Sequence, residues 1–298
     1  MGVADISLSQ AITQQLDQQQ LGIADLEEQI SSGRSLNKPS DDPAAVTQVL
    51  QLSSQASQLS NWQANAQTAT SWLGMGNNAV NSALDDMQSA RTLILQALNQ
   101  GTQDATTYEA VAQQLQGINA DLLSTANTQY EGRPIFAGTS ASTQAYDTSG
   151  NYLGNSDTPN VVIGSGPGSG QSAALSVPGP SVFGSGTASV FSTLTTVIGQ
   201  LGSGAPTATQ LNAALDALDA NIGTAEQASA VLGNGSDQVG AVSASLTTQL
   251  TSVQNTQAGL EDVNVATVTT QLDSEMTNYQ AAMWAASQAI PETLVHFL

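Results

Sequence analysis

The chain has 298 residues, 24 of them acidic and 4 basic, a net charge of −20 at pH 7 and no cysteine. Because proteins bind phosphates through Lys and Arg, this charge argues against nucleic acid and against an anionic membrane surface as partners. The lack of cysteine excludes disulfides and thiol chemistry. No apolar run approaches the ~18 residues of a membrane span, and the first residues lack the features of a cleaved secretory signal, so we expect neither.

The N-terminal run predicts a coiled-coil helix. Its apolar residues follow the 3–4 spacing of a heptad, and Gln19 takes the one polar position in the stripe. The apolar positions are Ile12, Leu16, Ile23, Leu26 and Ile30. The alternative, an amphipathic helix on a globular core, normally needs a wider stripe.

The next stretch, "ISSGRSLNKPSDDPAA", predicts the end of one helix and the start of another. Gly33 lies where a left-handed C-cap residue belongs. The sequence allows two starting points for the next helix: either Ser40 caps it, or Asp42 caps it with Pro43 as the first helical residue.

Arg34 and Lys38 lie in the same stretch and are half of the basic residues of the chain. No local cap requires their charges. In so acidic a chain we interpret them as candidate partners for acidic groups on a neighbouring subunit.

Long helical tracts are predicted over about 41–99 and 104–130, and again from 207 to 290, where no proline occurs. Residues 134–192 differ, because they hold ten of the 26 glycines and five of the nine prolines. Short strand-like pieces ("PIFAG", "NVVIG", "AALSVPG", "SVFG") alternate there with turn signals, which predicts a small β-rich insert.

The C-terminal run repeats the narrow stripe of the N-terminal one, and the two predict coiled-coil partners. The apolar residues of this stripe are Val265, Val268, Leu272, Tyr279, Met283, Ala286 and Ile290. Glu275 or Met276 takes the heptad position between Leu272 and Tyr279. The predicted subunit interface consists of the N-terminal stripe, Arg34, Lys38 and six C-terminal positions. These six are Val268, Leu272, Met276, Tyr279, Met283 and Ile290.

The predicted fold is therefore mainly α, a long helical bundle with terminal coiled-coil helices and a small β-rich insert domain. The boundaries expected from the sequence are a coiled-coil segment 1–44, helical halves 45–133 and 193–262 around the insert 134–192, and a second coiled-coil segment 263–298.

Catalytic, metal and cofactor sites find little support. The single histidine, His296, lies two residues from the end of the chain, a poor place for a Ser-His-Asp arrangement. The loop "DTSGNY" begins like a calcium loop at Asp147 but has Tyr152 in place of its glycine. The run "GSGPGSG" is not a nucleotide-binding loop. Acidic pairs such as Asp41-Asp42 suit caps or solvated faces better than acid-base catalysis, and the tryptophans, including Trp284, suit core or intersubunit packing.

Several motifs resemble the flagellin family. "LEEQISSGRSLNKPSDDPAAVTQVLQL" (26–52) is similar to its N-terminal signature, and "NKPSDDP" is closer to the hook-filament junction members than to filament flagellin. "LLSTANTQYEGRPIFAGTSASTQAY" (122–146), "QVGAVSASL" (238–246) and "SQAIPETLVHFL" (287–298) extend the resemblance. In "QVGAVSASL", Val242 replaces the basic residue that is usual there.

The resemblance implies a non-enzymatic axial subunit of the bacterial flagellum, a homo-oligomer in a ring at the hook-filament junction. Its implied partners are the first junction protein (FlgK), flagellin and an export chaperone, and it implies no cofactor. It also implies an extracellular location reached by type III export without a cleaved signal. Filament flagellin is the alternative. A secreted hydrolase or carbohydrate-binding module in the insert is a distant one.

Overall fold

The structure is a computed structural model that describes residues 2–99, 105–165, 170–204 and 206–289. It confirms the predicted fold class, because long helices dominate it and the strands are few and short. The chain divides into two compact units, one of residues 1–58 and 250–298 and the other of residues 59–249. None of the helices in the described residues is both long and apolar enough to cross a membrane.

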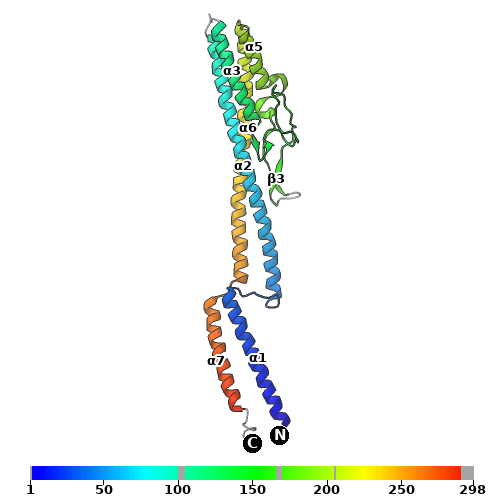
Figure 1. Ribbon diagram of the computed structural model, residues 1–298, viewed down its shortest axis with the longest axis vertical. Coiled ribbons are helices and arrows are strands. Elements are labelled where there is room, and N and C mark those ends of the chain that lie inside the picture. Colours follow the sequence, from blue (N-terminus) through cyan, green and yellow to red (C-terminus); the bar gives the residue numbers. More distant parts are fainter. Residues whose placement is uncertain (1, 100–104, 166–169, 205, 290–298) are drawn as a thin grey trace. The chain divides into compact units, whose positions relative to one another are not determined.

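The first unit contains both terminal helices, α1 (Gly2–Ser32) and α7 (Val265–Ala289), which lie side by side (Figure 1). It also contains the first turns of α2 (Pro43–Asn99) and the last turns of α6 (Ala208–Glu261). The pairing of the two ends agrees with the predicted pairing of their apolar stripes. The break between α6 and α7 contains no proline. Asn264 caps the start of α7, because its side-chain oxygen accepts a hydrogen bond from the Thr267 N–H at 3.2 Å.

The second unit packs the rest of α2 and α6 with α3 (Ala105–Ala126) and α5 (Val190–Gly202) (Figure 1). Small residues at the core of α2 let its backbone approach its neighbours closely. At Gly76 an added Cβ would lie 3.6 Å from Leu232 of α6 and 3.7 Å from Ile135. Arg91 of α2 makes a forked ion pair with Asp219 of α6, at 2.6 and 3.3 Å. The core side of α2 also contains four large buried side chains, those of Leu73, Val80, Met87 and Ile94.

Two antiparallel two-stranded sheets lie in the described residues, one just before the insert and one within it. The first pairs β1 (Gln129–Tyr130) with β2 (Arg133–Pro134), and the second pairs β3 (Asn160–Gly164) with β4 (Gln171–Ala174). A short helix α4 (Pro180–Phe183) and a 3-10 turn η1 (Gly186–Ala188) lead into α5.

One predicted strand is wrong: "SVFG" forms α4 and the residue after it. Pro180 is pre-set for the first helical position, and Gly184 (φ 74°) ends the turn by donating its N–H to the Pro180 carbonyl at 3.1 Å. "PIFAG" contributes only Pro134 to a strand, whereas "NVVIG" is β3 as predicted. The apolar and β-branched residues of "SVFG" favoured a strand, but Pro180 and Gly184 determine a helical turn there.

The insert has its own aromatic core. Tyr146 contacts Tyr152, Phe183 and Phe191, with ring centroids 5.1 to 5.6 Å apart, and Phe136 contacts Phe183 edge-on at 5.5 Å. Because Phe191 belongs to α5, this cluster joins the insert to the helical part of the same unit.

Candidate assembly interface

In the first unit, both chain ends change direction at one joint, formed by residues 33–42 and 262–264. α1 ends at Ser32, and Gly33 then adopts φ 72° while its N–H donates to the Gln29 carbonyl at 2.9 Å. This is the left-handed C-cap that the sequence predicted.

The start of α2 resolves the alternative left open by the sequence in favour of Asp42. α2 begins at Pro43, and the Asp42 carboxylate accepts the N–H groups of Ala44 and Ala45, both at 3.0 Å. The Ser40 cap is wrong. Asp41 serves the turn before the helix, where its carboxylate accepts the N–H groups of Asn37 and Lys38 at 3.0 and 2.8 Å.

The two segments of the joint bind each other through their backbones. Ser35 N–H donates to the Glu261 carbonyl at 2.7 Å, and Val263 N–H donates to the Gly33 carbonyl at 3.1 Å. The Ser35 hydroxyl lies 3.2 and 3.1 Å from the carbonyl oxygens of Leu260 and Glu261. The last carbonyls of an α-helix have no partner within the helix, so Ser35 supplies the donors that the end of α6 lacks.

Arg34 ties the same two segments by charge. Its guanidinium lies 3.2 Å from the Glu261 carboxylate, whose side chain is 13% exposed against 58% for Arg34. A basic side chain near a helix C-terminus also complements the partial negative charge of the free carbonyls. The sequence offered Arg34 for an acidic group on another subunit, and the structure gives it one within the chain.

Lys38 is likewise paired within the chain. Its Nζ lies 2.6 Å from a Glu28 oxygen and 3.7 Å from an Asp25 oxygen, both on α1. The hydrogen bond to Glu28, then the charge of Glu28, raise the pKa of Lys38 above its ordinary value. Pairing with a neighbouring subunit stays a prediction for both cations, and it would have to compete with these contacts.

The apolar stripes of α1 and α7 are only partly covered by each other. Ile12, Leu16, Ile23, Leu26 and Ile30 on α1 are half-buried, as are Leu272 and Tyr279 on α7. Val268 is buried at 6% exposure, but Met276 and Met283 remain 41% and 50% exposed. Ile290 lies outside the described residues. The predicted subunit-interface role of all these positions, Arg34 and Lys38 included, stays a prediction.

Two features of this pair favour a further covering layer. The predicted polar position, Gln19, has a side-chain oxygen that is shielded from solvent yet has no hydrogen-bond partner among the described residues. Trp284 is 69% exposed and Leu21 71% exposed, so both large apolar side chains lie outside the α1–α7 contact. The sequence singled out Trp284 for packing but not Leu21, which lies off the heptad stripe.

The described surface of the first unit has several grooves. One groove of about 330 Å³ runs between α1 and α7 and is lined by Ile23, Glu27, Met276 and Tyr279 among others. A second, about 190 Å³, lies at the joint between Leu36, Pro39 and Leu50, and Leu50 is 65% exposed.

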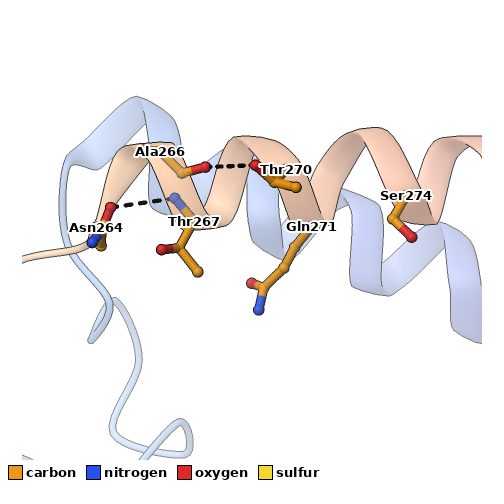
Figure 2. A pocket seen from close by; sticks show the side chains of 6 residues that line it. All are labelled: Asn264, Ala266, Thr267, Thr270, Gln271 and Ser274. Atoms are coloured by element: carbon orange, nitrogen blue, oxygen red, sulfur yellow. Dashed lines mark hydrogen bonds between the residues drawn. The ribbon is translucent and has the colours of Figure 1, made fainter.

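The third is a wide, shallow hollow of about 580 Å³ on one face of α7. Figure 2 shows its lining, which consists of small or polar side chains following one another along the helix: Asn264, Ala266, Thr267, Thr270, Gln271 and Ser274. The Thr270 hydroxyl donates to the Ala266 carbonyl at 2.9 Å, so it serves its own helix. Open grooves with such linings suit helix packing better than enclosure of a small ligand.

The described residues contain no group of three His, Cys, Asp or Glu side chains that could hold a metal. The Asp147 carboxylate accepts hydrogen bonds from the N–H groups of Ser149 and Asn151, both at 2.8 Å, and from the Asn151 amide at 2.9 Å. These bonds, that from the Asn151 side chain first, lower the pKa of Asp147. His296 and most of "GSGPGSG" lie outside the described residues.

Residues 3–141 match the family described as the bacterial flagellin N-terminal helical region. Over 133 residues the chain is 32% identical to flagellar hook-associated protein 3 of Escherichia coli, covering 44% of this chain and 42% of that protein. The relative of that name from Salmonella typhimurium is 34% identical over 131 residues, 43% of this chain and 41% of its own. The chain thus matches about two fifths of the length of these relatives. The resemblance inferred from the motifs is confirmed.

Solved structures share the fold. A flagellar hook-associated protein from Vibrio parahaemolyticus aligns with a TM-score of 0.68 at 20% identity, over 74% of this chain and 100% of that one. The flagellar junction protein FlgL from Legionella pneumophila aligns with a TM-score of 0.58 at 17% identity, over 72% of this chain and 100% of that one. At this identity the likeness establishes the fold alone.

Proposed function

We propose that this chain is a structural, non-catalytic subunit of the bacterial flagellum that forms a ring layer at the hook-filament junction. The observation that carries the proposal is the pair of terminal helices. α1 and α7 pair and meet at one joint, yet Met276, Met283 and Trp284 remain exposed. The similarity to proteins named flagellar hook-associated protein 3 supports the same conclusion.

In this proposal the half-covered stripes of α1 and α7 pack against the same helices of neighbouring copies. Two helices alone cannot cover the apolar stripes of both, and exposed large apolar side chains are typical of an interaction surface. The ring would contact the first junction protein (FlgK) on one side and flagellin on the other. The subunit would be exported by the type III route, held by a chaperone, to an extracellular position in the flagellum.

The first experiment is deletion of the gene in the source bacterium. The expected result is intact hooks, absent filaments and flagellin shed into the medium. Filaments that persist after deletion would contradict the junction role.

The second experiment complements the deletion with Leu26→Asp combined with Leu272→Asp. Both side chains belong to the predicted apolar stripes and are half-buried, so two carboxylates there should abolish filament attachment. The matched control adds the same charges at exposed positions, Gln18→Asp with Asn278→Asp, and should complement fully. Motility that survives the first pair would rule out the paired-helix interface.

Filament flagellin remains the second candidate, because the matching family model describes a flagellin region. Copy number separates the two. A junction layer requires few copies per flagellum, whereas a filament requires thousands, so quantitative mass spectrometry of isolated flagella decides between them.

A further inference from the structure

A tight turn just before the insert presents Arg133 at the surface. Tyr130 of β1 and Arg133 of β2 pair directly, and Glu131 and Gly132 connect them with φ of 49° and 77°. Two successive positive φ values are typical of the type I′ hairpin turn, in which Asn or Gly is favoured at the position that Glu131 occupies. A side chain other than glycine held at positive φ is a local strain, and such strain is often retained where a surface has a role.

The Arg133 guanidinium lies on an aromatic platform. Its Cζ is 5.9 Å from the centroid of the Trp72 ring, and that ring is 5.2 Å from the Tyr130 ring. Trp72 is 5% exposed, whereas Arg133 is exposed. A guanidinium held over an aromatic ring can still donate its N–H groups to a carboxylate or phosphate.

Arg133 differs from the other three basic residues of the chain. Arg34, Lys38 and Arg91 lie 3.2, 2.6 and 2.6 Å from carboxylate oxygens. Within the described part of the chain, no carboxylate lies within ion-pair distance of Arg133. Arg133 is therefore an exposed cation without a counter-charge among the described residues, on a chain whose net charge is −20.

A second copy of the chain offers 24 acidic residues, and a carboxylate placed directly opposite Arg133 would supply the missing counter-charge. We propose that the hairpin tip, residues 130–133, is a contact surface between neighbouring copies, and that Arg133 binds a carboxylate of the next copy through two parallel N–H donors. The contact is heterologous, since a tip meets a different surface, and such contacts build rings or helical layers. The inference rests on the proposed function, which brings copies side by side.

The test is site-specific cross-linking in assembled flagella. A photo-reactive amino acid replaces Gln129, which is exposed and precedes the tip, in the full chain expressed in the deletion strain. A covalent dimer of this chain is expected. Arg133→Gln should lower the dimer yield about tenfold, the loss of one charge-assisted contact. Arg133→Lys should give an intermediate yield, because a point charge remains over Trp72 without the planar fork.

The matched control is Arg91→Gln, which removes an exposed arginine of the same unit that is already paired with Asp219; the dimer yield should not change. A cross-link to a different polypeptide, the absence of a dimer, or equal yields for Arg133→Gln and the unsubstituted chain would each overturn the proposal. Failure of the proposed function would appear instead in the deletion phenotype, which does not depend on Arg133.

Discussion

Ser35→Ala should loosen the joint without affecting the rest of the chain. The substitution keeps the Ser35 N–H bond to the Glu261 carbonyl and removes the hydroxyl, which lies 3.2 and 3.1 Å from two carbonyl oxygens at the end of α6. One hydroxyl has one proton, so the two contacts together count as a single shared hydrogen bond. A bond of this kind contributes about 1 kcal/mol, or about a fivefold change in an equilibrium constant.

Ser35→Ala should destabilise the joint more than Arg34→Gln does. The Arg34 side chain is 58% exposed, and exposed ion pairs are screened and contribute roughly 0 to 1 kcal/mol. The Arg34 effect should also vanish in high salt, whereas the Ser35 effect should not.

Native-state hydrogen exchange measures the opening of the joint directly. The Val263 N–H bonds to the Gly33 carbonyl across the joint, so its exchange should become about fivefold faster in Ser35→Ala. Amides in the second unit should be unchanged. Ser40→Ala is the control, since Ser40 is exposed in the same segment. If Val263 exchanges at the same rate in Ser35→Ala and in the control, the hydroxyl does not hold the joint.

Other substitutions test the caps and the insert. Asp42→Ala should cost about 1 kcal/mol and speed exchange in the first turn of α2, whereas Asp42→Ser should retain most of the cap. Tyr146→Phe should be neutral or stabilising in urea unfolding, because the Tyr146 hydroxyl is buried and has no hydrogen-bond partner in the described part of the chain. Tyr152→Phe should cost about 1 kcal/mol, since the Tyr152 hydroxyl lies 2.9 and 2.7 Å from two carbonyl oxygens; equal effects of the two changes would contradict the assignment. Burial raises the pKa of Tyr146. The folded chain therefore keeps a proton that the unfolded chain loses above about pH 10, so the unfolding free energy should fall as pH rises through that value, and less steeply in Tyr146→Phe.

Features set by a few neighbouring residues could be predicted from the sequence. Gly33 ends α1, as predicted, because glycine adopts positive φ at little cost. Heptad spacing likewise predicted that α1 and α7 would pair. The choice between Ser40 and Asp42 could not be made in this way, because both residue types cap helices equally well and only the observed backbone shows which carboxylate or hydroxyl reaches the free N–H groups.

Contacts between residues distant in the chain depended on the tertiary structure. Nothing near Arg34 in the sequence indicates Glu261, its ion-pair partner 227 positions later, and nothing near Arg133 indicates that it lies over the Trp72 ring. Local patterns report the preferences of a backbone segment, whereas the partner of a charged side chain is set by which distant surfaces packing brings together. The sequence alone therefore determined the long helices and the end of α1. The tertiary structure decided that two of the scarce cations are paired at the joint and that Arg133 has no ion-pair partner among the described residues.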